Sequence, residues 1–101
     1  MTRIASQLPA GLTCYRKTSE FTHDSVPAAL LRAHSTKAGV WGLLRVLRGR
    51  IRYCLDSDEK ETLIVSTGGT VAIEPEAPHH VEFLDADSAF QVEFHRAEAD
   101  Q

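Results

Sequence analysis

Residues 40–55 read VWGLLRVLRGRIRYCL, and the pattern of this stretch indicates the architecture of the chain. Its first half, residues 40–47, is apolar at most positions, which predicts a strand covered on both faces. Gly49 follows and tolerates the positive φ of a tight turn. The second half, residues 50–55, alternates, with apolar side chains on one face and arginines on the other. The stretch therefore predicts two β-strands joined by a tight turn.

Period-two segments recur along the rest of the chain, at intervals of roughly ten residues. They cover residues 12–17, 20–22, 61–65, 70–74, 79–84 and 89–95. One helical segment, residues 28–33, follows Pro27, with Asp24 or Ser25 as its cap. Short strands with one minor helix predict an all-β protein, built as an antiparallel sandwich or barrel.

Length and composition predict one domain in a reducing compartment. The chain has 101 residues, enough for a single domain over residues 1–101 with a core at about 8–96. Its first residues lack the apolar stretch of a secretory signal, so a cytoplasmic location is expected. Cys14 and Cys54 are then expected as free thiols.

Charge and missing motifs exclude several function classes. The formal net charge is −3, whereas a general nucleic-acid interface needs a basic excess. The longest apolar run is far too short to span a bilayer, which takes about 20 residues. The chain has no phosphate-binding loop, no Gly-x-Gly-x-x-Gly and no Gly-x-Ser-x-Gly. We therefore expect neither nucleic acid nor a membrane as partner.

Histidines and carboxylates in two distant stretches are candidate metal ligands. Neighbouring residues of a strand face opposite ways, so only one of His79 and His80 points inward, and parity with Val81 selects His79. His34, His79 and either Glu74 or Glu76 would supply nitrogen and oxygen ligands for a divalent ion. The alternative is that these are solvated loop residues. His23 and His95 are expected at the surface.

Basic side chains and the single tryptophan have two interpretations each. Lys37 lies in a glycine-containing loop near His34 and places a cation at a pocket mouth, or is an exposed lysine. The arginines at 45, 48, 50 and 52 bind an anion, or form the solvated face of a hairpin. Trp41 is expected in the core or at an interface.

Several sequence motifs resemble those of known protein families. VLRG at 46–49 and IEPEAPH at 73–79 resemble the two cupin motifs. More specifically, residues 26–42, 73–79 and 92–94 resemble the small tellurite-resistance-associated (TehB/YeaR-like) family, and the likeness extends over residues 8–96.

This resemblance implies a single cupin jelly roll, commonly a homodimer, with a divalent metal inside the barrel. Zinc, iron, nickel and manganese are the candidate ions. His79 matches the ligand of the second motif, but the His-x-His of the first is missing, with Lys37 near the place of its second histidine. The substitutes for the missing ligands are His34, Glu74, Glu76 and Glu93. Ligand contacts are assigned to Lys37, Trp41 and Glu93.

The resulting functional prediction is a stress-associated cupin that binds a divalent metal and a small molecule or oxyanion inside its barrel. One alternative is a metal-dependent oxygenase or isomerase, with Glu76 as base and Lys37 beside an oxyanion. Another is an interaction domain with a filled barrel. Some relatives carry this domain in front of a methyltransferase, but the chain has no glycine-rich nucleotide loop, so methyl transfer is not expected of it.

Overall fold

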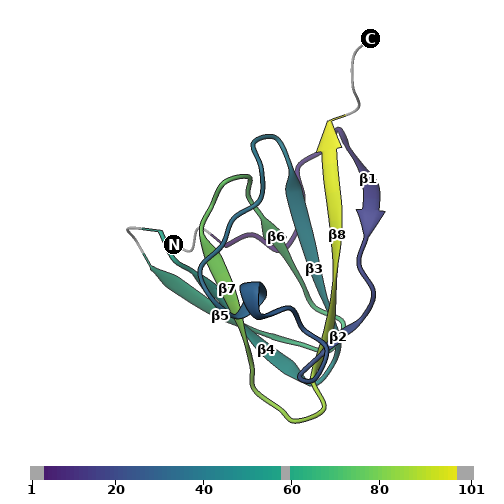
Figure 1. Ribbon diagram of the computed structural model, residues 1–101. Coiled ribbons are helices and arrows are strands. Elements are labelled where there is room, and N and C mark those ends of the chain that lie inside the picture. The colour runs from purple at the N-terminus through teal and green to yellow at the C-terminus, as the bar shows by residue number, and fades with distance from the viewer. Residues whose placement is uncertain (1–3, 58–59, 98–101) are drawn as a thin grey trace.

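The computed structural model describes residues 4–57 and 60–97, and its strands form two antiparallel sheets (Figure 1). The elements are β1 (Leu12–Lys17), β2 (Phe21–Thr22), the 3₁₀ helix η1 (Ala28–Leu31), β3 (Trp41–Arg48), β4 (Arg50–Leu55), β5 (Glu61–Ser66), β6 (Thr70–Ile73), β7 (His79–Phe83) and β8 (Ala89–Ala97). The first sheet has the order β1-β8-β3-β6, with β2 also paired to β8, and the second has the order β5-β4-β7. The predicted all-β class is confirmed.

The turn at Gly49 is a corner between the sheets. β3 pairs with β6 and β8, whereas β4 pairs with β5 and β7, so the strands that flank the turn do not form a hairpin. Gly49 has a φ of 66°, and a Cβ there would lie 2.9 Å from the Cα of buried Ser88. Glycine therefore lets the chain pass from one sheet to the other against Ser88.

The helix predicted at residues 28–33 is only a single 3₁₀ turn in the structure. Residues 28–31 form η1, but Arg32 already has extended backbone, and no side chain caps the first turn. A segment of this length cannot hold an α-helix without capping or a buried face, and none of its residues is buried. No helix in the described part of the chain is long and apolar enough to cross a membrane.

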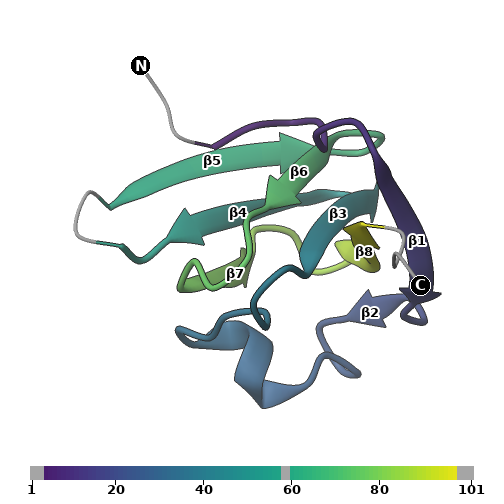
Figure 2. The same ribbon diagram turned by 90° about the horizontal axis from the view of Figure 1, so that it is seen from above.

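The hydrophobic core lies between the two sheets. Every second residue of β3 is buried, and the inward residues of the other strands meet them. The fully packed side chains include Leu44, Val46, Ile51, Tyr53, Val71 and Phe90. In Figure 2, η1 lies on the side of the molecule opposite β5. The sheets stay separate, so the closed barrel is not formed among the described residues.

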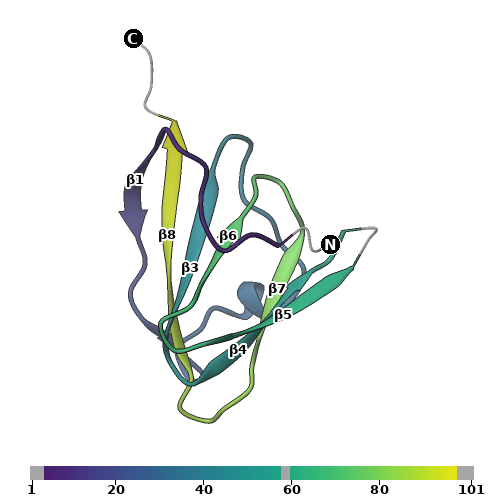
Figure 3. The same ribbon diagram turned by 180° about the vertical axis from the view of Figure 1, so that it is seen from behind.

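The N-terminal segment lies along β6, which would otherwise be an open edge (Figure 3). The amide of Ala72 donates to the carbonyl of Ala5 at 2.8 Å, and the hydroxyl of Thr70 donates to the carbonyl of Ser6 at 2.7 Å. In the second sheet β5 pairs with β4 alone among the described strands. The first sheet is thus covered at β6, while β5 remains an outer strand.

Candidate functional site

A cavity of about 420 Å³ opens between the two sheets. Its walls are mainly apolar side chains of β2, η1, β3, β6, β7 and β8. They include Phe21, Leu30, Leu44, Ile73, Val81, Phe90, Val92 and Phe94. Cavities of this size with apolar walls and a few polar groups are typical of small-molecule sites. The filled interior that a pure interaction domain requires is therefore not found.

His34 and His79 come together at this cavity. An isolated β-bridge joins them: each backbone amide donates to the other's carbonyl, at 3.0 Å from His34 and 2.8 Å from His79. The centres of the two imidazole rings are 4.1 Å apart, and both residues line the cavity. The structure thus brings together the two distant histidines that the sequence had singled out.

The His79 ring is held in one orientation and one protonation state. Only 2% of the residue is exposed, and its Nδ1 donates to the carbonyl of Ala77 at 2.8 Å. The ring stacks on Tyr53 with 5.5 Å between ring centres. Burial lowers the pKa of His79 to about 4. At neutral pH the imidazole is uncharged, and its Nε2 carries a lone pair.

His80 points away from the cavity, as strand alternation predicts. Its Nδ1 lies 2.7 Å from a carboxylate oxygen of Asp56, and its Nε2 lies 3.4 Å from Glu82. The hydrogen bond with Asp56 raises the pKa of His80. His80, Glu82 and Cys54 lie close together, but the ion pairs with Asp56 and Glu82 already engage both ring nitrogens of His80.

The charged residues that line the cavity are basic, and no carboxylate is among the described lining residues. Lys37 and Arg16 are exposed residues that also line it. The Lys37 loop is tied down, because the Thr36 hydroxyl donates to the Val40 carbonyl at 2.8 Å and the amide of Glu76 donates to the Thr36 carbonyl at 3.1 Å. None of the described residues that line the cavity is an aspartate or glutamate. Its charged groups therefore favour an anion.

The two predicted carboxylate ligands lie outside the cavity. Glu74 and Glu76 are both exposed, and neither lines the cavity. Ile73 is buried, so strand alternation directs Glu74 outward. Glu76 has a φ of 62°, in the turn that follows Pro75. These carboxylates are not grouped with His34 and His79 in the structure.

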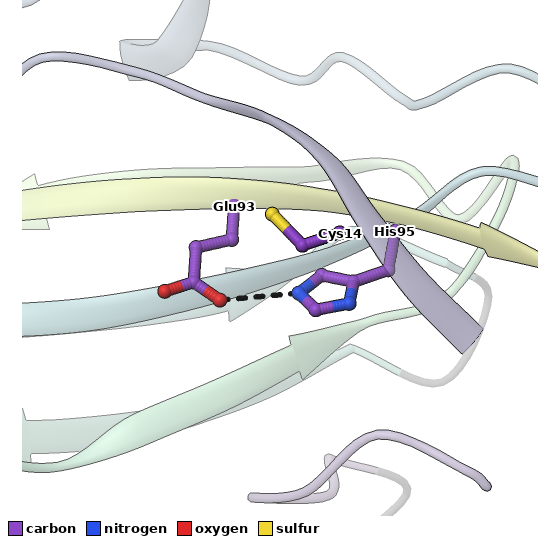
Figure 4. A group of neighbouring side chains, drawn as sticks. All are labelled: Cys14, Glu93 and His95. Carbon is purple, nitrogen blue, oxygen red and sulfur yellow. Dashed lines mark hydrogen bonds and ion pairs between the residues drawn. The ribbon is translucent and has the colours of Figure 1, made fainter. Parts of the chain in front are cut away.

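Trp41 and Glu93, assigned to the ligand, do not line the cavity. Glu93 lies on the outer face of the first sheet, beside Cys14 and His95 (Figure 4). His95 is not a free surface group, since its Nε2 is 3.1 Å from Glu93 and its side chain is 14% exposed. The free thiol of Cys14 is exposed, and that of Cys54 is buried. Strand alternation separates these outer residues from the cavity.

The arginines at positions 45, 48, 50 and 52, which lie on β3 and β4, form ion pairs. Their carboxylate partners are Glu93 for Arg45, Glu20 for Arg48, Asp85 for Arg50 and Glu82 for Arg52. Each guanidinium thus has a carboxylate neighbour, so the four do not converge on one anion. The solvated face is the interpretation that fits these contacts.

Sequence reasoning missed the contribution of β1 to the cavity. Tyr15 and Arg16 are neighbours in the chain, yet both line it. A register shift between Cys14 and Arg16 in the pairing with β8 interrupts the alternation of β1. A bulge of this kind leaves no local signal in residues 12–17, so alternation could not have selected both side chains.

Comparison with known proteins supplies the family. Residues 16–92 match the model of the family described as "TehB-like domain". The chain is 32% identical over 80 residues to the "Probable S-adenosyl-L-methionine-dependent methyltransferase TehB" of Haemophilus influenzae, an alignment that covers 75% of this chain and 28% of that protein. It is 25% identical over 96 residues to "Uncharacterized protein YeaR" of Escherichia coli, covering 87% and 81%.

Two solved structures share the fold. A crystal structure of a protein from E. coli K12 superposes with a TM-score of 0.84 at 25% identity, and covers 92% of this chain and 98% of that one. Crystalline TehB from H. influenzae gives a TM-score of 0.72 at 27% identity, over 87% of this chain and 32% of that one. The chain thus spans about a third or less of the length of the TehB proteins that it matches.

These relatives overturn the prediction of a metal-binding cupin. The TehB proteins are named as S-adenosylmethionine-dependent methyltransferases, and their names mention neither a divalent metal nor a cupin. The predicted divalent ion is therefore wrong. The two alternative functions, a metal-dependent oxygenase or isomerase and an interaction domain with a filled barrel, are wrong as well. The physical reason lies in the ligand set, because the carboxylates that were to complete it, Glu74 and Glu76, lie outside the cavity.

The coarser prediction of a small-molecule partner agrees with the names of these relatives, since a methyltransferase acts with a small methyl donor. The likeness extends over strands of both sheets and over both histidines of the cavity. With residues 16–92 matched, well over half of its length, this chain belongs to the TehB-like domain family.

Proposed function

We propose that this chain is the acceptor-binding domain of a methyl-transfer system, and that its cavity holds a small organic molecule with an apolar body and one anionic group. The observation that carries the proposal is the cavity of about 420 Å³, whose apolar walls are combined with two basic side chains and an uncharged imidazole. The link to methyl transfer comes from the names of the TehB relatives.

The charges at the cavity favour the methyl acceptor over the donor. S-adenosylmethionine carries a positive sulfonium, and Lys37 and Arg16 would repel it. Donor recognition also benefits from carboxylates, and none of the described lining residues supplies one. The methyl donor would then bind on a different fold, while this domain presents the molecule to be methylated.

Each of the two imidazoles can contribute one hydrogen bond to a ligand. His34 Nδ1 donates to the carbonyl of Arg32 at 3.0 Å, and His79 Nδ1 donates to Ala77, so each ring has only Nε2 left for a ligand. With a pKa of about 4, His79 accepts a hydrogen bond but is a poor proton acceptor at neutral pH. It therefore orients a ligand through a hydroxyl, thiol or amide donor.

A matched pair of probes tests the proposal. The ligands 1-naphthoate and 1-naphthylmethylammonium share an apolar body and differ in the sign of their charge. Isothermal titration calorimetry on the full chain should show saturable binding of the anion and at least about tenfold weaker binding of the cation. Lys37→Ala should weaken naphthoate binding about fivefold or more, whereas Lys60→Ala, at an exposed lysine that does not line the cavity, should not.

Two results would contradict this assignment. Equal affinity for both probes would show that charge at the cavity does not select the ligand. Micromolar binding of S-adenosylmethionine that His79→Gln abolishes would show that the cavity holds the donor. Tellurite is a third probe for the same titration. It is a small oxyanion, and the sequence predicts an oxyanion as one kind of ligand for this cavity.

We also propose that the chain forms a homodimer through β5. This strand pairs only with β4 among the described strands, and it exposes 38% of Leu63 and 52% of Ile64. An open strand edge with apolar side chains is a template for antiparallel pairing with a second copy, which satisfies both edges by two-fold symmetry.

Three further predictions stay proposals. The two sheets, with the cavity between them, support an open jelly-roll sandwich. The shared core supports one domain over residues 1–101 with its core at about 8–96, although residues 1–3, 58–59 and 98–101 lie outside the described part. The cytoplasmic location rests on the sequence alone.

A further inference from the structure

The two histidines at the cavity each keep one ring nitrogen that no described residue binds. The backbones of His34 and His79 are joined by two hydrogen bonds, of 3.0 Å and 2.8 Å, and their ring centres are 4.1 Å apart. Each ring forms a single hydrogen bond, from Nδ1 to a backbone carbonyl, which is that of Arg32 for His34 and that of Ala77 for His79. Both Nε2 atoms are therefore unpaired among the described residues.

The free Nε2 of His79 faces the cavity. Only 2% of this residue is exposed, yet no buried side-chain nitrogen or oxygen in the described part of the chain lacks a hydrogen-bond partner. An Nε2 without a partner consequently lies in accessible space, and for a buried residue that lines the cavity this space is the cavity itself. His34 lines the same cavity, with its ring against that of His79. The two free nitrogens thus belong to one site.

Both free nitrogens are hydrogen-bond acceptors. A carbonyl oxygen can only accept, so Nδ1 carries the hydrogen in each ring, and the neutral imidazole then has its lone pair on Nε2. Burial keeps His79 neutral, because it lowers the pKa of that ring to about 4. With the ring centres this close, one small chemical group reaches both rings. Two acceptors side by side favour a ligand that brings two donors, because a single donor leaves one buried lone pair unsatisfied.

We propose that the pair formed by His34 and His79 selects a ligand with two adjacent hydroxyl groups on an aromatic ring, a catechol-type molecule. This inference rests on the proposed function of the cavity, and it names the chemical class of the molecule bound there. Each hydroxyl donates to the Nε2 of one histidine. A flat aromatic body suits the aromatic part of the walls, to which Phe21, Phe90 and Phe94 belong.

Three probes with one aromatic body test the pair. Isothermal titration calorimetry on the full chain compares 2,3-dihydroxynaphthalene with its isomer 2,7-dihydroxynaphthalene and with 2-naphthol. A pH of about 7.5 lies above the ordinary histidine pKa and leaves the probes largely uncharged. The 2,3-isomer has the adjacent hydroxyls and should bind about fivefold tighter than either of the others, which is the gain from one further hydrogen bond. EDTA in every solution prevents a metal ion from bridging hydroxyls and imidazoles.

A variant of His34 removes one acceptor and keeps a flat ring. His34→Phe leaves the backbone bridge to His79 in place, since that bridge uses main-chain atoms. The affinity for 2,3-dihydroxynaphthalene should fall to that for 2-naphthol, while the affinity for 2-naphthol changes by less than about twofold. His23→Phe is the matched control, at a side chain that is 73% exposed and does not line the cavity, and it should keep the wild-type order of affinities.

Nitrogen-15 NMR of the imidazoles tests the acceptor pair without any ligand. Long-range proton–nitrogen correlations distinguish a ring with its hydrogen on Nδ1 from one with its hydrogen on Nε2, and the spectrum of His34→Phe assigns the signals. In the free protein both His34 and His79 should carry the hydrogen on Nδ1. Addition of 2,3-dihydroxynaphthalene should shift the Nε2 signals of both rings.

Three results would overturn the proposal. The first is equal affinity for the two dihydroxy isomers, or no saturable binding of the 2,3-isomer. The second is a difference between the isomers that survives in His34→Phe, and the third is a hydrogen on Nε2 of either ring in the free protein at about pH 7.5. Because these probes are neutral, the outcomes are independent of the test with naphthoate and naphthylmethylammonium. Equal binding of that charged pair would contradict selection of an anion and leave the selection of adjacent hydroxyls standing.

Discussion

The buried His79 should make the stability of the folded chain fall in weak acid, and His79→Gln should remove most of that fall. Burial lowers the His79 pKa to about 4 in the folded chain, from an ordinary value of 6.5 that the unfolded chain regains. Above about pH 6.5 the ring is neutral in both states and contributes no pH dependence. Between those two pKa values only the unfolded chain binds the proton, so acid favours unfolding.

The magnitude follows from the two pKa values. The free energy of unfolding should fall by up to about 1.4 kcal/mol per pH unit in this window. Between about pH 7.5 and about pH 5 the loss from His79 alone is about 2 kcal/mol. The ring is 2% exposed, so solvent screening reduces this figure little. Below about pH 4 both states are protonated, and the contribution levels off.

Urea denaturation at a series of pH values, at constant ionic strength, measures this effect. Wild type and His23→Gln should lose similar stability between about pH 7.5 and about pH 5, while His79→Gln should lose about 2 kcal/mol less. Glutamine keeps a hydrogen-bond donor near Ala77, and its own cost in stability cancels when each protein is compared with itself at two pH values. An acid dependence in His79→Gln equal to that of wild type would refute the reasoning.

Three further changes test the corner and the outer strand. Gly49→Ala places a Cβ 2.5 Å from the Ser88 Oγ at a φ of 66°, so it should lower the free energy of unfolding by about 2–4 kcal/mol in urea denaturation, and a loss below about 1 kcal/mol would contradict the tight corner. Ser88→Ala removes a hydroxyl that donates to the Arg50 carbonyl at 2.7 Å and accepts from the amides of Arg50 and Asp85. It should cost about 2–3 kcal/mol, and a neutral result would show that water replaces these bonds. Ile64→Lys should convert a dimer to a monomer in light scattering after size exclusion, whereas an unchanged mass would exclude β5 as the interface.

Several elements could be predicted from local sequence because strand alternation is a short-range signal. Residues 12–17 and 50–55 form strands with the predicted bounds, and the alternation of His79 and His80 correctly selects the buried histidine. Gly49 marks a turn because its conformational freedom belongs to the residue itself. The helix predicted at 28–33 shrinks to one turn, because helix propensity without caps or a buried face does not hold a longer segment.

Composition and alternation by themselves determined that this chain is all-β, where the strands at residues 12–17 and 50–55 begin and end, and which of two adjacent histidines is buried. These properties depend on neighbours within a few residues. Only the tertiary structure decided that β3 and β4 belong to different sheets, that Arg16 reaches the cavity while Glu74 does not, and that Cys14 meets His95 across the pairing of β1 with β8. Such placements follow from which distant strands pair and in which register, and packing of the whole core selects that pairing.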